Sequence, residues 1–223
     1  MLNWRWKMKP LWETTRGKTT FLKSLRENAS VLDVGCGNNS PVNFKFLRPD
    51  FRYIGIDVGD YNQVFDPKSV ADEYLVVAPN EFASAVERYE GVMDGVVSAH
   101  NLEHCNEPRR VLVAMANALK IGGRMYLSFP CERSVYFPKR AGCLNFYDDN
   151  THTVAPPVWQ DVIDTLITFG FRFDFKTKRY RPLPLALKGL VLEPKSARDR
   201  KVIEDGSTWA LYGFESVIWA TKR

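Results

Sequence analysis

The chain has 223 residues, of which 45% are hydrophobic and 26% charged, the composition of a globular protein large enough to bury a core. No apolar run approaches the roughly 20 residues that span a bilayer, and the N-terminus carries charges without the apolar stretch of a secretory signal. The formal net charge is +5 and the four cysteines form no CxxC pair, so we expect a reduced, cytoplasmic protein.

Strands and helices are predicted to alternate after a loose arm over residues 1–12 and a helix over 13–28. Apolar runs predict strands at 31–34, 52–57, 73–77, 95–98, 124–129, 171–175 and 216–221. Further helices are predicted to begin at Ser40, with Ser40 as N-cap, to span 80–90, to begin at Pro108 and to span 157–168. The roughly 40 residues between the last two strands contain no clear helix, which favours an antiparallel final strand.

This alternation predicts an α/β protein with a Rossmann-like, doubly wound sheet. The sheet would have seven strands and be mostly parallel, with an antiparallel last strand. We expect a single domain over residues 1–223. Residues 131–155 and 176–212 are predicted to be insertions on the substrate side, because long irregular segments in a compact domain are often functional.

A loop with two glycines follows the first predicted strand. Gly35 and Gly37 permit a tight turn and a close approach of the backbone to a ligand, at the sheet edge where doubly wound folds bind ligands. A dinucleotide-binding loop would have a third glycine or alanine where this chain has Ser40. Asp33 also disfavours a diphosphate and suits a ligand that carries an ammonium group.

Asp57 ends the second predicted strand, where its carboxylate can accept both hydroxyls of a ribose. This feature supports a nucleoside ligand without choosing between NAD and another nucleoside. Four segments then resemble the class I methyltransferases that use S-adenosylmethionine (SAM), in the order in which that superfamily has them. These segments are VLDVGCGNNS (31–40), YIGID (53–57), DGVVSAHNLEH (94–104) and LKIGGRMYLSFP (119–130).

The resemblance implies a SAM-dependent methyltransferase and assigns its cofactor-binding residues. The glycine loop would hold the amino-acid part of SAM, the end of the second strand the ribose, and the end of the fourth strand the methionine and sulfonium region. The residues so assigned are Asp33, Gly35, Cys36, Gly37 and Asn38 for the amino-acid part, Asp57 and Val58 for the ribose, and Ser98, Ala99 and His100 for the methionine and sulfonium region. Asn80 and Glu81 are alternatives for the adenine.

A hydroxyl acceptor must lose its proton, and imidazole is the natural base near neutral pH. His152 is predicted as the base, oriented by Asp149 or Asp148, with a structural role in its loop as the alternative. His152 lies in a segment that resembles the D-x-T-H segment of superfamily members linked to sugars and surface polysaccharides. His100 is included among the catalytic residues, and His104 is expected to cap or orient its loop. Because the order HNLEH departs from HExxH and no third ligand is evident, no metal is expected.

Residues 176–201 contain nine lysines and arginines but only two acidic residues. This local basic patch favours an anionic partner, either a phosphate- or nucleotide-linked acceptor or a membrane surface, with a solvated basic face as the alternative. The charge is too local to predict nucleic-acid binding. The sequence therefore favours O-methylation of a sugar or polysaccharide-precursor hydroxyl. The alternatives are a methyltransferase for a phenol, quinone or carboxylate, and a non-catalytic SAM-binding module in a biosynthetic complex.

Overall fold

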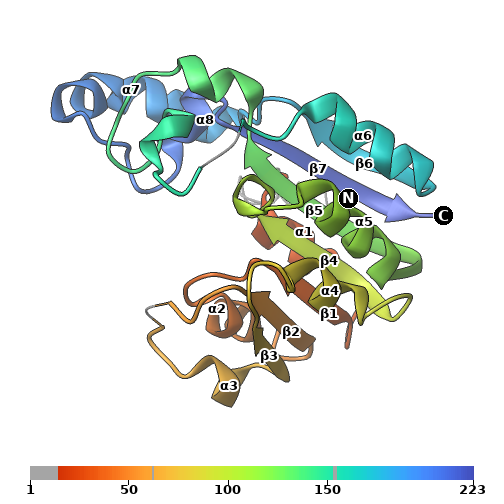
Figure 1. The fold of residues 1–223 in the computed structure, drawn as a ribbon. Helices are drawn as coiled ribbons and strands as arrows, with labels where there is room; N and C mark the ends of the chain where they lie inside the picture. Colours follow the sequence, from red (N-terminus) through yellow and green to blue (C-terminus); the bar gives the residue numbers. More distant parts are fainter. Residues whose placement is uncertain (1–14, 62, 153–154) are drawn as a thin grey trace, which may run out of the picture.

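The computed structural model describes residues 15–61, 63–152 and 155–223, which form a seven-stranded sheet between two layers of helices (Figure 1). The strand order is β3-β2-β1-β4-β5-β7-β6. Six strands run in one direction, and β7 is antiparallel to both β5 and β6. The predicted fold class is confirmed. The strands are β1 (Ser30–Val34), β2 (Arg52–Asp57), β3 (Glu73–Val76), β4 (Met93–Ala99), β5 (Leu119–Pro130), β6 (Phe171–Thr177) and β7 (Glu215–Lys222).

The two faces of the sheet bury different sets of side chains, because alternate residues of a strand point to opposite sides. One face packs against α4 (Phe82–Glu87), α5 (Pro108–Ala118) and α6 (Trp159–Thr168). The other face packs against α1 (Lys18–Lys23) and α2 (Ser40–Leu47). In β4, for example, Val96 belongs to the first cluster and the adjacent Val97 to the second.

Two helix predictions, one of a helix's bounds and one of an N-cap, differ from the structure. The helix predicted over 13–28 spans only Lys18–Lys23 among the described residues, and the predicted arm over 1–12 lies outside them. Helix α2 begins as predicted, but its N-cap is Asn39, in a left-handed conformation. Ser40 does not cap the helix, because its hydroxyl donates to Asp33 instead. The short helix α3 (Pro67–Val70) was not predicted.

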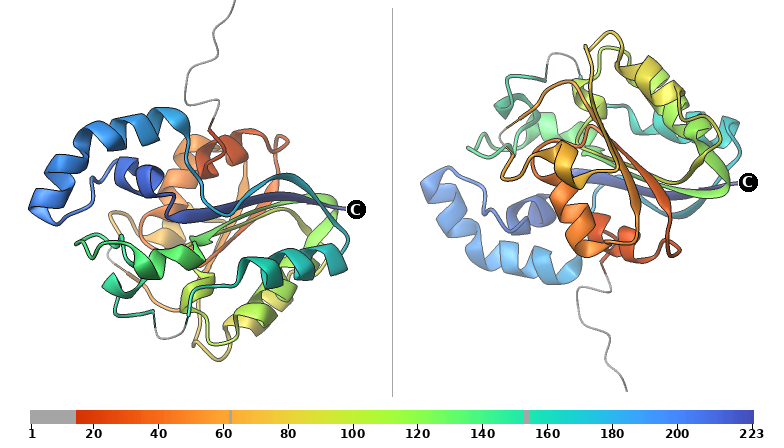
Figure 2. Two further views of the ribbon diagram at one scale, coloured as in Figure 1. Left: turned by 90° about the horizontal axis from the view of Figure 1, so that it is seen from above. Right: turned by 90° about the horizontal axis from the view of Figure 1, so that it is seen from below.

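The largest departure from the prediction lies between the last two strands. This segment contains α7 (Leu183–Asp199) and α8 (Ser207–Tyr212), which pack against each other beyond the carboxyl ends of the parallel strands (Figures 1 and 2). The segment after β5 lies beside them and includes the short 3-10 helices η3 (Glu132–Tyr136) and η4 (Phe146–Asp148). Buried Arg140 joins the two predicted insertions, because its guanidinium donates to Glu193 at 2.6 Å. The insertions therefore form one structural unit at the carboxyl edge of the sheet.

Within the described part of the chain, no helix combines the length and apolarity needed to cross a bilayer. All four cysteines carry free thiols.

Candidate functional site

A cavity of about 480 Å³ opens at the carboxyl ends of β1, β2 and β4. This is the edge at which doubly wound sheets bind their ligands. The lining includes the glycine loop, the turn after β2, the start of α4, and the segment from β4 to α5 with the 3-10 helix η2 (Leu102–His104). The lining residues are Gly35, Gly37, Asn38, Asp57, Val58, Tyr61, Pro79, Phe82, Ala83, His100, Asn101, His104, Cys105, Asn106, Glu107, Val111 and Thr151.

The glycine loop is shaped by two close approaches. Gly35 has φ +74°, and a Cβ added there would lie 2.3 Å from the Asn101 side chain, so the backbone and this amide pack directly together. The Gly37 N–H donates to one oxygen of Asp57 at 2.6 Å, and the Val58 N–H donates to the other at 2.7 Å. Asp57 therefore ties the loop to the end of β2 while its carboxylate borders the cavity.

Asp33 lies below the loop and is only 1% exposed. Its Oδ2 accepts hydrogen bonds from the Ser40 hydroxyl at 2.6 Å and from the Tyr53 hydroxyl at 3.0 Å. Burial raises the pKa of Asp33 above its ordinary value, against the opposing effects of Lys18 and of these hydrogen bonds. Asp33 is not among the residues that line the cavity. Its observed contacts connect β1, β2 and α2, and a direct contact with an ammonium group stays a prediction.

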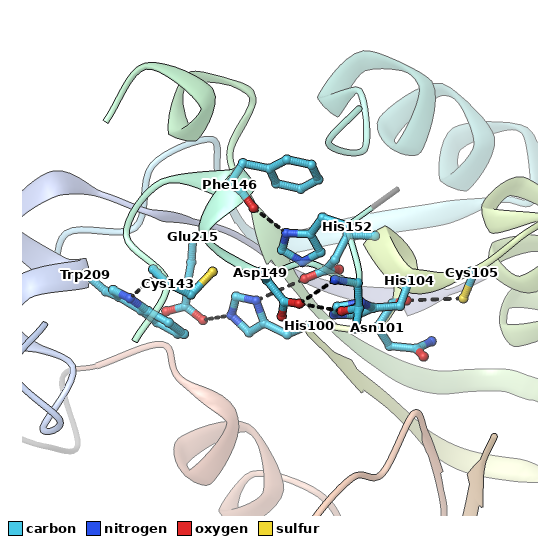
Figure 3. Close-up of polar contacts among 12 residues, drawn as sticks. His100, Asn101, His104, Cys105, Cys143, Phe146, Asp149, His152, Trp209 and Glu215 are labelled. Atoms are coloured by element: carbon cyan, nitrogen blue, oxygen red, sulfur yellow. Dashed lines mark hydrogen bonds and ion pairs between the residues drawn. The ribbon is translucent and has the colours of Figure 1, made fainter. Parts of the chain in front are cut away.

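His100 follows β4 with a left-handed backbone, φ +52°. Its Nδ1 lies 3.1 Å from Glu103 and its Nε2 lies 2.8 Å from Glu215 (Figure 3). Burial alone would lower the pKa of His100, but the hydrogen bonds and charges of the two carboxylates outweigh it and raise the pKa to about 10. His100 is therefore an imidazolium at neutral pH with both ring nitrogens engaged. This geometry argues against the predicted catalytic role of His100 as a proton acceptor.

His104 is exposed, lines the cavity and belongs to a three-residue relay. The Thr151 hydroxyl lies 2.5 Å from Asp149 Oδ1 and 3.0 Å from His104 Nδ1. A hydroxyl has one proton, and a carboxylate only accepts, so Thr151 donates to Asp149 and accepts from the Nδ1–H of His104. The lone pair of the neutral imidazole then lies on Nε2.

His152 is held in a different way from that predicted. Its Nδ1 lies 2.5 Å from the backbone carbonyl of Phe146 and donates to it, and its ring stacks on the Phe146 ring at 4.1 Å. Asp149, the predicted orienting carboxylate, accepts from the N–H and the hydroxyl of Thr151. Among the described residues the Asp149 carboxylate makes no hydrogen bond to the His152 ring, and the two residues are joined only by the backbone N–H of His152, which donates to the Asp149 carbonyl at 3.2 Å. The predicted Asp149–His152 pair is therefore corrected to an Asp149–Thr151–His104 relay. The ring of His152 lies 4.6 Å from that of His104.

The structure thus brings together only part of the predicted site. Of the predicted cofactor residues, Gly35, Gly37, Asn38, Asp57, Val58 and His100 line the cavity, whereas Asp33, Cys36, Ser98 and Ala99 are not in its lining. The two alternatives for the adenine, Asn80 and Glu81, are also not in the lining, where Pro79 and Phe82 lie instead.

Asn101, His104 and Thr151 are among the lining residues that the sequence interpretation missed as site residues. The signal available for Asn101 and His104 was their place directly after a buried strand, in the same segment as His100. The signal for Thr151 was its position between Asp149 and His152.

The cavity fits the SAM molecule that the sequence resemblance implies. The Nδ2 of Asn101, a residue only 8% exposed, has no hydrogen-bond partner among the described residues and can donate to a polar group of a ligand. The Asp57 carboxylate can accept ribose hydroxyls, and Phe82 and Pro79 offer apolar surface for a base. The cluster of His100, Glu103 and Glu215 has a net charge of −1 when His100 is protonated, which suits a sulfonium cation.

Comparisons with known proteins agree with this geometry. The profile of a family described as "Methyltransferase domain" matches residues 8–165. No curated protein gives a significant match. Similar solved structures include a SAM-dependent methyltransferase from Archaeoglobus fulgidus, with 18% identity, TM-score 0.54 and coverage of 94% of this chain and 97% of that chain. A SAM-dependent methyltransferase from Listeria monocytogenes has 16% identity, TM-score 0.57 and coverage of 91% and 96%. A complex between the Haloferax volcanii Trm112 methyltransferase activator and a methyltransferase has 16% identity, TM-score 0.60 and coverage of 90% and 86%.

Proposed function

The chain belongs to the methyltransferase-domain family and is a SAM-dependent methyltransferase, and from this premise we propose that it methylates a hydroxyl oxygen of a small molecule or glycan. The observation that carries the proposal is the pair of imidazoles, His104 and His152, with ring centroids 4.6 Å apart beside the cofactor cavity. A hydroxyl is the acceptor that most needs such groups, because it must lose a proton to become an effective nucleophile.

Each imidazole has one ring nitrogen without a hydrogen-bond partner among the described residues, because a neighbouring group fixes the proton on the other nitrogen. The relay to Asp149 fixes the Nδ1–H of His104, and the Phe146 carbonyl fixes the Nδ1–H of His152. Both Nε2 atoms therefore carry a lone pair in the neutral rings. His104 is the better placed of the two to accept the proton, because it lines the cavity whereas His152 is only 9% exposed.

Bound SAM supplies an electrophilic methyl group on a positively charged sulfur. The residues of this chain position the reacting groups around it. Asp57 and the glycine loop orient the nucleoside, Asn101 donates to a polar group, and His104 accepts the proton of the acceptor hydroxyl. Holding two reactants in an aligned geometry contributes roughly 7–11 kcal/mol in well-oriented intramolecular reactions, so positioning is the larger part of the task.

The narrower form of the proposal is an acceptor hydroxyl on a sugar or polysaccharide precursor. It is supported by the segment from Asp149 to His152, which borders the cavity through Thr151. A phenol, quinone or carboxylate acceptor is the alternative within the same enzyme class. A non-catalytic SAM-binding module is the alternative outside it, and this alternative predicts cofactor binding without transfer to any acceptor.

The basic segment gives less support to a phosphate-linked acceptor than its charge suggests. Five of its nine cations make ion pairs or hydrogen bonds within the chain, and a sixth, Lys176, lies over the Phe173 ring at 4.5 Å. Lys188, Arg198 and Lys201 form ion pairs, and Arg179 and Arg181 donate to backbone carbonyls of α8. No residue of segment 176–201 is among the described residues that line the cavity.

Helix α7 instead supports a peripheral contact with an anionic membrane surface. Leu183, Leu187, Leu190 and Val191 recur at helical spacing and are all at least 55% exposed. An apolar stripe beside lysines and arginines is the pattern of helices that lie in the membrane interface. The free thiols are consistent with a reducing cytoplasmic side of that membrane.

The function is tested by incubating the protein with SAM and a panel of acceptors and measuring S-adenosylhomocysteine release and the mass of each acceptor. The panel contains nucleotide sugars, free monosaccharides, phenols, a quinol and carboxylic acids. We expect a mass gain of one methyl group on a hydroxyl compound. His104→Ala and His152→Ala should retain SAM binding by calorimetry and lose turnover by about 10²-fold or more for the residue that accepts the proton. Methylation of carboxylates alone, or turnover unchanged in both variants, would overturn the proposal.

A further inference from the structure

Three potential metal ligands converge beside the cofactor cavity. One ligand atom each from Glu103, His104 and His152 lies within 4.8 Å of the other two. Glu103 and His104 belong to η2, directly after β4, and His152 comes from the segment that follows β5. Figure 3 shows these two segments side by side, with the rings of His104 and His152 close to each other. Two imidazoles and one carboxylate form a ligand set that divalent transition metals use in proteins.

Each of the three side chains is held by a further partner, which is the arrangement found around metal ligands. A ligating histidine usually donates its other ring N–H to a carbonyl or a carboxylate, and a ligating carboxylate is itself hydrogen-bonded. His152 donates to the Phe146 carbonyl, and His104 donates to Thr151. The Oε1 of Glu103 accepts from His100 at 3.1 Å.

The remaining oxygen of Glu103 has no partner. Its side chain is completely buried, and Oε2 makes no hydrogen bond to any residue that the structure describes. Burying a carboxylate oxygen without a hydrogen-bond partner costs free energy. Such an oxygen therefore normally indicates a place where a water, a ligand or an ion binds. Because an oxygen of Glu103 and a ring nitrogen of each imidazole lie within 4.8 Å of one another, a cation is the species that satisfies all three groups at once.

We propose that Glu103, His104 and His152 bind a divalent transition-metal ion, which activates the acceptor hydroxyl. The inference rests on the proposed hydroxyl methylation and replaces the role of His104 as base with a role as metal ligand. Two nitrogen ligands favour zinc, manganese or cobalt over magnesium and calcium, which prefer oxygen ligands. Three protein ligands leave a coordination position open for an acceptor, as in catalytic metal sites.

The chemical step is an ordinary methyl transfer with the ion as Lewis acid. Coordination lowers the pKa of the acceptor hydroxyl, whose proton passes to water. The oxygen then forms a bond to the methyl carbon while the bond from that carbon to sulfur breaks, and the sulfonium becomes a neutral thioether. No group is oxidised or reduced. The imidazoles then act through the ion and do not themselves carry the proton.

A second set of potential metal ligands shares His152 with this site but is less suited to binding an ion. Cys143, Asp149 and His152 also place ligand atoms within 4.8 Å of one another. Asp149 is already engaged, because its Oδ1 accepts two hydrogen bonds from Thr151. Ligands around a tetrahedral zinc lie about 3.4 Å apart at zinc–nitrogen distances of about 2.1 Å. Glu103, His104 and His152 therefore need to approach one another by at most about 1.4 Å, and His104 is the exposed one of the three.

Metal binding is measured on the full chain after treatment with a chelator and dialysis. Zinc is titrated calorimetrically, and cobalt(II) is followed by its visible absorption, which reports coordination geometry. We expect one ion per chain. Glu103→Gln keeps the size of the side chain and an oxygen that can accept from His100, and should weaken cobalt binding about 10–100-fold. His104→Ala removes an exposed ligand and should give the same result if the first variant folds poorly. Glu132→Gln, which changes an exposed carboxylate outside the cavity, is the matched control.

Two results overturn the inference. One is wild-type protein that binds neither ion stoichiometrically, or binds cobalt no better than the Glu103→Gln variant. The other is chelator-treated protein that methylates the acceptor at the full rate with no gain from added metal. In the second case the proposed hydroxyl methylation stands, and His104 acts as a base without an ion. If protein that was never treated with a chelator does not bind SAM, the proposed function itself is refuted.

Discussion

Replacing Gly35 by alanine should destabilise the protein far more than the same change at Gly37, two residues away in the same loop. Both residues have a positive φ, +74° at Gly35 and +58° at Gly37, so both changes force an alanine into the left-handed region. That conformation costs an L-residue roughly 1–2 kcal/mol. The two positions differ in what surrounds the added methyl group.

The space around the two glycines sets the difference between the variants. At Gly35 the new Cβ would meet three atoms of the Asn101 side chain at 2.3–2.5 Å, whereas at Gly37 no atom lies within 4 Å. Forcing a methyl group into such a contact costs typically about 1–3 kcal/mol. We therefore expect Gly35→Ala to lose about 2–5 kcal/mol of unfolding free energy, and Gly37→Ala about 1–2 kcal/mol.

Urea denaturation of the ligand-free protein measures this difference directly. Thermal melting gives a second reading, at roughly 2–4 °C per kcal/mol for a chain of this size. The protein must be free of SAM, because a methyl group on Gly37 faces the cavity and can weaken cofactor binding without affecting stability. An equal loss of stability in the two variants would refute the claim that Asn101 packs on the glycine loop.

Three further outcomes follow from the contacts around the site. Thr151→Val breaks the relay to Asp149 and should lower turnover about tenfold with SAM affinity unchanged, whereas Thr151→Ser should retain activity. In sedimentation with phosphatidylglycerol vesicles, Leu190→Glu should reduce binding, whereas Ile121→Glu, at an exposed apolar residue outside α7, should not; equal binding of both would contradict a membrane role for α7. Burial raises the pKa of Asp205, but hydrogen bonds from Lys188 and Ser207 outweigh it and lower the pKa to about 2. Its contribution to stability is therefore present above its ordinary value of 3.8 and is lost as the pH falls towards 2, and Lys188→Met should raise its pKa towards 3.8 by NMR titration.

The parts of the site that the sequence predicted are those built from neighbouring residues. Gly35 and Gly37 follow a buried strand and Asp57 ends the next one, and parallel strands bring their carboxyl ends to the same edge. A short apolar run followed by a polar residue is therefore enough to place them. Six of the ten predicted cofactor residues therefore line the cavity, and the other lining residues come from the segments after β2, β3, β4 and β5.

The predictions that were wrong depend on contacts between distant segments. His100 is made an imidazolium partly by Glu215, 115 residues further along the chain. The missed helix α7 contains Pro194 and Gly189, both poor helix formers. A Cβ at Gly189 would lie 2.2 Å from the Ser207 carbonyl oxygen, so this glycine permits the close packing of α7 on α8. Local propensity argued against the helix, and packing against α8 reversed that preference.

The segment HNLEH shows why the order of residues alone could not identify a metal site. An HExxH site depends on an α-helix, in which residues four apart share a face. Here the segment ends in the 3-10 helix η2, and His100 and Glu103, three residues apart, contact each other. That contact engages one oxygen of Glu103 and leaves the second without a hydrogen-bond partner among the described residues, and a Glu103 oxygen lies within 4.8 Å of a ring nitrogen of both His104 and His152. The Glu103 carboxylate thus contacts the His100 imidazolium, which borders the cofactor cavity. The same carboxylate lies close to the neutral imidazoles of His104 and His152, where we expect the acceptor to bind. If the acceptor side does bind an ion, removing the carboxylate of Glu103 should affect both halves of the site, whereas removing the imidazole of His104 should affect only one.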